Sequence, residues 1–171
     1  MLYYIQHTHA GEEVKREMAI ELIGIVRHAN APGAFLSSEG IEQAQRIAQI
    51  VACIDPQDEF WGFGCSDTWR AIQTALVIAQ AVKHRDDSVQ VMRELYSNGR
   101  KTAEVVKALS KLSCKRIMLV SHCYGVIPLI KACMERFCAG HEKIMFPWEG
   151  RPGNSQGVLI EVASQTLQFI P

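Results

Sequence analysis

The stretch GIVRHANA, residues 24–31, determines which architecture we expect, because an apolar run ends there in a cation and an imidazole, Arg27 and His28. The run begins at Ile20, and the segment from Ile20 to Val26 has the length and composition of a buried strand. The polar pair therefore stands at the carboxyl end of that strand. Ligands of open α/β sheets bind at the carboxyl ends of strands, so this stretch predicts both a central strand and a binding site.

The rest of the chain alternates apolar runs of strand length with segments of helical period, which is typical of α/β domains. Further strands are expected at residues 60–65, 88–92, 116–121, 157–162 and 167–170. A short gap separates the last two, which predicts an antiparallel hairpin at the edge of the sheet. We therefore expect an α/β fold, a three-layer sandwich with a mostly parallel central sheet, helices on both faces and an antiparallel edge strand.

Amphipathic segments between the strands predict four helices. The expected N-cap of the first helix is Ser37, and that of the second is Ser66 or Asp67. The apolar face of the first helix comprises Ile41, Ala44, Ala48 and Val51. The buried stripe of the second helix comprises Ala71, Ala75, Ile78 and Val82.

Two shorter helices are expected in the second half of the chain. One covers residues 102–112, with Val105, Leu109 and Leu112 on one side. The other covers residues 128–137, and we place Pro128 in its first turn, where a missing N–H matters least. Its apolar side comprises Ile130, Met134 and Phe137.

Length and charge limit the class of protein. The 171 residues fit one domain, residues 20–171, preceded by an N-terminal extension, residues 1–19. Lys and Arg balance Asp and Glu at 18 each, so no global field attracts nucleic acid or an anionic membrane. No apolar run approaches the roughly 20 residues that span a bilayer. The N-terminus lacks the basic segment followed by an apolar segment that is typical of a signal peptide. We expect a cytoplasmic protein that binds a small substrate.

Cysteine and histidine spacings argue against a disulfide framework or a metal centre. The six cysteines lie in apolar surroundings without C-x-x-C spacing, which favours reduced thiols. In the extension, His7 and His9 would supply two ligands of a metal site, but no third ligand is evident. These spacings predict no metal site, and we also expect no cofactor. The extension has no assigned function, although residues 2–6 are expected to form an arm or an extra edge strand.

Three predicted elements present basic side chains at the same edge of the sheet. His28 follows the first strand, Arg70 lies in the first turn of the second helix, and His122 follows the strand at 116–121. Each position lies at or just beyond the carboxyl end of a strand. Arg27 directly precedes His28 and adds a second guanidinium group to that of Arg70. The spacing therefore predicts a cluster of two imidazoles and two guanidinium groups.

These residues carry a resemblance to a known family. VRHANA, residues 26–31, resembles the Arg-His signature of the histidine phosphatase superfamily, which includes phosphoglycerate mutases and the small uncapped bacterial phosphohistidine phosphatases. LSSEGIEQAQRIA, CSDTWRAIQTA and LVSHCYGVI resemble further blocks of that family and occur in its order. The resemblance covers residues 20–162, and the small uncapped branch is the most similar.

The resemblance implies a metal-independent phosphatase that forms a phosphohistidine. His28 would accept the phosphoryl group as nucleophile, and Arg27 and Arg70 would hold the phosphate by bidentate hydrogen bonds. His122 and the backbone N–H of Cys123 would stabilise the charge of the transition state.

Other positions leave alternatives open. Glu94 resembles the general acid of the mutase-like branch, but its surroundings also resemble the short phosphohistidine phosphatase branch, where the same position is a solvated carboxylate. Residues 147–157 either fold over the rim, where Trp148 and Arg151 would contact substrate, or form a plain surface loop, which we favour.

We therefore expect hydrolysis of a phosphomonoester or a phosphoramidate, with a phosphorylated small molecule or a phosphohistidine protein as partner. Phosphoryl transfer of the phosphoglycerate mutase type is an alternative. A second alternative is a catalytically silent phosphate-binding module, because Asn30 departs from the usual motif and the acid is uncertain.

Overall fold

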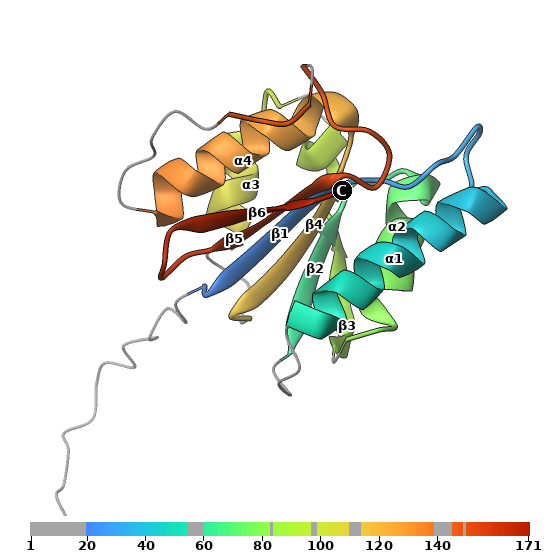
Figure 1. Cartoon of the computed structure of the whole chain (residues 1–171), viewed down its shortest axis with the longest axis horizontal. Coiled ribbons are helices and arrows are strands. Elements are labelled where there is room, and N and C mark those ends of the chain that lie inside the picture. The colour runs from blue at the N-terminus through green and yellow to red at the C-terminus, as the bar shows by residue number, and fades with distance from the viewer. Residues whose placement is uncertain are drawn as a thin grey trace, which may run out of the picture.

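The computed structural model describes residues 20–54, 60–82, 84–96, 99–109, 114–138, 145–148 and 150–171, with the backbone alone at 84–88. Within these residues the strands are β1 Leu22–Arg27, β2 Trp61–Cys65, β3 His84–Val91, β4 Arg116–Ser121, β5 Gly157–Glu161 and β6 Thr166–Ile170. They form one sheet in the order β3-β2-β4-β1-β5-β6 (Figure 1). Strands β1 to β4 run parallel, and β5 is antiparallel to both of its neighbours. The mostly parallel sheet and its edge hairpin are confirmed.

Helices cover both faces of this sheet. On one face lie α1, Ser38–Ile54, and α2, Trp69–Ala79, and on the other lie α3, Thr102–Leu109, and α4, Cys123–Phe137 (Figure 1). A short 3-10 helix, η1, Arg93–Tyr96, follows β3. The three-layer α/β sandwich expected from the sequence is therefore confirmed.

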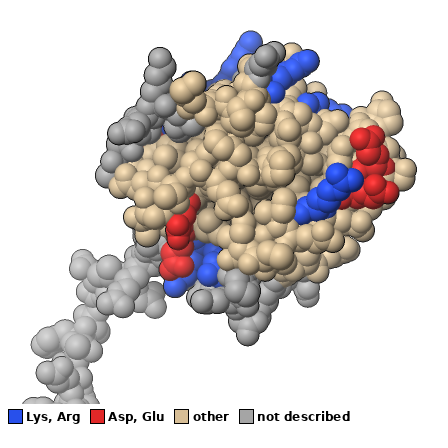
Figure 2. Space-filling view, viewed as in Figure 1, with Lys and Arg blue, Asp and Glu red and all other residues tan. Residues whose placement is uncertain are grey.

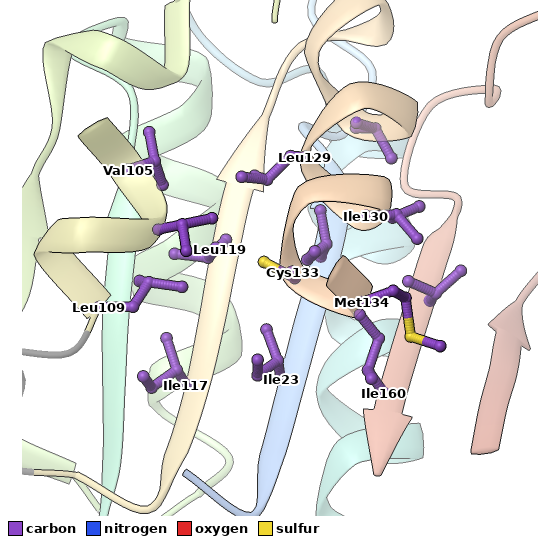
Figure 3. Close-up of a cluster of buried hydrophobic side chains, with 14 of the residues drawn as sticks. Ile23, Val105, Leu109, Ile117, Leu119, Leu129, Ile130, Cys133, Met134 and Ile160 are labelled. Carbon is purple, nitrogen blue, oxygen red and sulfur yellow. The ribbon is translucent and has the colours of Figure 1, made fainter. Parts of the chain in front are cut away.

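Side-chain alternation along the strands divides the core into two clusters. Ile23 and Ile25 of β1 belong to the cluster under α3 and α4, whereas Val26 belongs to the cluster under α1 and α2. In β4, Ile117 and Met118 are divided between the two clusters in the same way. Figure 3 shows the first cluster, where strand side chains meet those of α3 and α4. Burial on both faces makes the central strands almost continuously apolar, which is why the sequence reveals them.

The buried face of α1 differs by one position from the expected one. Ile41 is 42% exposed, and Gly40 and Ile47 are buried in its place. Gly40 faces the backbone of Asn30, which only a residue without a side chain can approach so closely. This close approach turns Ile41 outward.

The start of α4 was also wrongly predicted. The helix begins at Cys123, so Pro128 lies inside it rather than in its first turn. Pro128 has no N–H to donate to the carbonyl of Tyr124, four residues earlier. Burial of Leu129 and Ile130 against the sheet nevertheless maintains the helix through this position.

Some predictions lie outside the described residues. These are the arm at residues 2–6, the histidines His7 and His9, and the end of the third helix at Leu112. In the part of the chain that is described, every helix is too short or too polar to traverse a bilayer. On the face shown in Figure 2, basic and acidic side chains form small groups separated by large uncharged areas.

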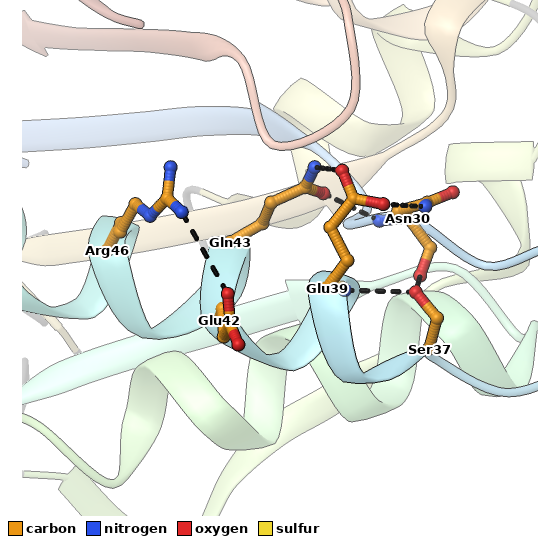
Figure 4. Close-up of polar contacts among 7 residues, drawn as sticks. Asn30, Ser37, Glu39, Glu42, Gln43 and Arg46 are labelled. Atoms are coloured by element: carbon orange, nitrogen blue, oxygen red, sulfur yellow. Dashed lines mark hydrogen bonds and ion pairs between the residues drawn. The ribbon is translucent and has the colours of Figure 1, made fainter.

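The loop after β1 is tied to the start of α1 (Figure 4). The N–H of Asn30 donates to Gln43 Oε1 at 2.9 Å, and its Nδ2 donates to Glu39 Oε2 at 2.7 Å. Ser37 Oγ donates to the Asn30 carbonyl at 3.3 Å and accepts from the Gly40 N–H at 3.1 Å. The second bond confirms Ser37 as the N-cap. Helix α1 thus holds the backbone just beyond β1.

We expect Gly40→Ala to lower the free energy of unfolding by about 1–2 kcal/mol, although Ala normally favours a helix. The reason is that a Cβ at this position would collide with the carbonyl oxygen of Asn30. Gly33→Ala is the control, because nothing lies within 4 Å of a Cβ built there. Urea unfolding measures both variants. Wild-type stability of Gly40→Ala would contradict the packing of α1 on this loop.

Candidate active site

The ends of two neighbouring strands bring two histidines together. Arg27 at the end of β1 pairs in register with Ser121 at the end of β4. His28 and His122 therefore leave the sheet at the same level. The backbone N–H of His28 donates to the Ser121 carbonyl at 3.0 Å, and the two ring centroids are 5.0 Å apart. Both residues are buried, since only 8% of the surface of His28 and 6% of the surface of His122 is exposed.

The surroundings of His28 fix which ring nitrogen carries the proton. Nδ1 lies 2.8 Å from the carbonyl oxygen of Ala29. A carbonyl only accepts, so Nδ1 carries the hydrogen of the neutral ring and Nε2 carries the lone pair. Arg70 Nε donates to this Nε2 at 3.2 Å. Ala29 is itself fixed, because its N–H donates to Thr74 Oγ1 at 3.1 Å.

Both expected arginines reach the site. Arg27 Nη1 donates to the carbonyl of Pro152 at 3.1 Å, whereas Arg27 Nε is buried without a hydrogen-bond partner. Within the described ranges, neither Arg27 nor Arg70 has an ion pair with a carboxylate. Two positive groups therefore lie beside the histidines, and no carboxylate of the described residues forms an ion pair with either of them.

Ser66 contacts the second histidine, and its assignment as a helix cap is wrong. Its Oγ lies 2.7 Å from His122 Nε2, and the residue is fully buried. The N-cap of α2 is Thr68, without a side-chain cap bond, so Asp67 is not the cap either. Ser66 follows β2 directly, just as His28 follows β1. This position at the carboxyl end of a strand is the sequence signal that could have identified Ser66 as a site residue.

The short helix η1 contributes an aromatic ring to the site. Tyr96 packs edge-on against His122, with ring centroids 4.7 Å apart. Sequence reasoning did not single out Tyr96 as a site residue, although it follows a strand as the other site residues do. Glu94 lies half-buried on the same short helix, and Cys123 lies half-buried at the start of α4.

The segment between α4 and β5 folds back over the end of β1. The Ser155 N–H donates to the His28 carbonyl at 3.3 Å, and the Arg27 N–H donates to the Gln156 carbonyl at 2.9 Å. Pro152 and Ser155 are buried. The interpretation of residues 147–157 as a plain surface loop is therefore wrong for its second half.

The two residues named in this segment lie in different places. Trp148 stacks on Phe146 and packs edge-on against Phe169, with centroid distances of 5.7 and 5.5 Å, next to the core under α3 and α4. Arg151 is exposed, and its Nη1 donates to the Tyr124 hydroxyl at 3.0 Å. Tyr124 lies in the first turn of α4. Arg151 is thus the one placed beside the histidine cluster.

Solved structures resemble this chain over most of its length. A protein histidine phosphatase SixA complexed with tungstate superposes with a TM-score of 0.56 at 20% identity, covering 88% of this chain and 94% of its own. The chain has the histidine phosphatase fold. A phosphoglycerate mutase from Plasmodium falciparum shares that fold, with a TM-score of 0.54, 14% identity and 88% of each chain covered.

A mycobacterial glucosyl-3-phosphoglycerate phosphatase also shares the histidine phosphatase fold. Its TM-score is 0.53 at 12% identity, and the match covers 87% of this chain and 96% of that chain. No protein-family model and no curated protein sequence matches this chain. The likeness therefore supports the architecture, and the chemistry has to be argued from the side chains.

Burial keeps both histidines of this histidine phosphatase fold neutral. Burial of the ring, aided by Arg70 and Arg27, lowers the pKa of His28 from 6.5 to about 4, although the bond to Ala29 opposes the shift. Burial, followed by the proximity of His28 and the two arginines, lowers the pKa of His122 from 6.5 to about 3. At neutral pH both rings are therefore unprotonated.

We expect the protein to lose stability as the pH falls from 6.5 toward 4. In this range an unfolded His28 takes up a proton while the folded, buried His28 does not, so protonation favours the unfolded state. The loss from His28 alone should reach about 3 kcal/mol. Urea unfolding at several pH values compares wild type with His28→Gln, in which this part of the pH dependence should disappear. Identical pH profiles for the two proteins would contradict a buried neutral His28.

Proposed function

We propose that this protein is a metal-independent phosphatase that hydrolyses a phosphomonoester or a phosphoramidate through a phosphohistidine on His28. The observation that carries the proposal is the fixed neutral state of this ring. Its Nδ1 hydrogen is committed to Ala29, so Nε2 carries the lone pair, which accepts from Arg70 Nε and becomes free to attack when a phosphate engages that guanidinium. An imidazole attacks phosphorus only as the neutral base, with its lone pair directed at the electrophile.

Arg27 and Arg70 supply the binding energy for the phosphate. Planar guanidinium groups match phosphate oxygens by paired hydrogen bonds. The buried Nε of Arg27 has no partner, and a buried unpaired donor is costly, so a bound anion would satisfy it. A tetrahedral oxyanion, tungstate, occurs in one of the similar structures, and we infer that this site binds the same kind of anion.

We assign His122 and the start of α4 to stabilising the charge that develops during transfer. His122 is the N-cap of α4, so the backbone N–H of Cys123 belongs to the first turn, where N–H groups have no acceptor within the helix. Such donors stabilise the equatorial oxygens of the transferring group. We assign Ser66 to positioning, because its hydroxyl contacts His122 Nε2 and fixes the ring.

The reaction proceeds in two balanced steps. In the first, His28 Nε2 bonds to phosphorus while the bond from phosphorus to the leaving oxygen or nitrogen breaks, and the leaving group takes a proton. In the second, a water oxygen bonds to phosphorus while the bond from phosphorus to His28 Nε2 breaks. The base left after the first proton transfer takes a proton from the water, and inorganic phosphate leaves. Glu94 is the candidate donor of the first proton. The substrate is a phosphorylated small molecule or a phosphohistidine protein.

We expect His28→Ala to abolish phosphate release and to remove acid-labile labelling of the protein by a radiolabelled phosphate donor, because the nucleophile is lost. Binding of tungstate to this variant, measured by calorimetry, should persist, since both arginines remain. The control is Cys53→Ala, at an exposed cysteine on α1.

Retained turnover or labelling in His28→Ala would overturn the assignment of the nucleophile. Interconversion of phosphoglycerates without release of phosphate would assign mutase chemistry instead. Tungstate binding by a protein that releases phosphate from no substrate of a broad panel would indicate a silent phosphate-binding module.

We expect Glu94→Gln to slow the hydrolysis of an alkyl phosphomonoester about 10²-fold and that of a phosphoramidate much less. An alkoxide leaving group needs a proton donor, whereas a phosphoramidate depends less on one. Steady-state rates on both substrates, with wild type and the variant, measure the difference. Wild-type rates on both substrates would identify Glu94 as a solvated carboxylate.

A further inference from the structure

A second polar pair lies beside the site and has no role in the proposed transfer. Arg151 Nη1 donates to the Tyr124 hydroxyl at 3.0 Å, and the Arg151 guanidinium carbon lies 5.7 Å from the centroid of the Tyr124 ring. Both residues are exposed, Tyr124 by 57%. A hydrogen bond and a ring contact with the same tyrosine hold the guanidinium in one orientation.

The backbone places this pair next to the phosphate clamp. Pro152, which follows Arg151, accepts the hydrogen bond from Arg27 Nη1 at 3.1 Å. Tyr124 stands two residues after His122, in the first turn of α4. The pair therefore joins the two segments that flank the histidines.

The charges around the clamp agree with this placement. Burial is the main reason that the pKa of Arg27 is lowered, and the nearby charges of Arg151 and Arg70 lower it further, whereas Cys123 opposes the shift. Among the described residues, no carboxylate forms an ion pair with any of these three arginines. A phosphate group carries at most two negative charges near pH 7. The two positive charges of Arg27 and Arg70 are enough to balance them. The charge of Arg151 is therefore available to a second anionic group.

We infer that Arg151 and Tyr124 form a subsite for a second anionic group, a carboxylate, that the substrate carries beyond the transferred phosphoryl group. This inference rests on the proposed function and specifies its substrate class, a phosphorylated molecule with a carboxylate near its phosphate. The guanidinium would hold the carboxylate by paired hydrogen bonds. The Tyr124 oxygen already accepts from Arg151, so its O–H would donate to the same carboxylate.

Non-hydrolysable phosphonates test the subsite without requiring turnover. The probes are ω-carboxyalkylphosphonates of increasing chain length and the matching terminal amides, which have nearly the same shape but lack the second charge. Calorimetry measures the Kd of each pair for wild type, Arg151→Gln and Tyr124→Phe. The control is Arg136→Gln, an exposed arginine in the last turn of α4 and about 18 Å along the helix from Tyr124.

Wild type should bind the carboxylate of one chain length about fivefold more tightly than its amide, a modest ratio because the pair is exposed. Arg151→Gln should bring this ratio to about one, Tyr124→Phe should reduce it, and Arg136→Gln should preserve it. Equal ratios in wild type and Arg151→Gln would overturn the inference while the phosphate site still bound the probes. Failure of all probes to bind wild type would overturn the proposed function and the inference together.

Discussion

The in-register pairing of β1 with β4 is the constraint on which the site depends. Because Arg27 lies opposite Ser121, the residues that follow both strands emerge side by side and their rings touch. A slip of one residue would send every side chain of β1 to the other face of the sheet. Pairs such as Ile25 and Leu119, buried on the same face, prevent that slip. Packing of the core and alignment of the imidazoles are thus one property of the structure.

Burial acts differently on the two kinds of basic group. An imidazole has a pKa near neutrality, so withdrawal from water leaves His28 and His122 uncharged. A guanidinium stays protonated even when its pKa is lowered, so Arg27 keeps its charge beside the neutral rings. One apolar enclosure thereby produces a basic nitrogen next to fixed cations. Such a combination suits a reaction in which a neutral base attacks an anion.

The sequence predicts those features that depend on local pattern. Strands buried on both faces appear as apolar runs, and His28, Arg70 and His122 are found at the expected places beyond them. Features that depend on contacts between distant segments were missed. The bond of Ser66 to His122 and the outward turn of Ile41 follow from how helices seat on the sheet. No periodicity contains that information, and tertiary packing overrides local preference in such cases.

The hydrogen bond from Arg27 to Pro152 joins residues 125 positions apart in the chain. During synthesis the amino-terminal part of a protein leaves the ribosome first. Strand β1 therefore emerges long before the segment that fixes its last side chain. The nascent chain therefore cannot complete the Arg27 side of the histidine cluster until residue 152 has left the exit tunnel.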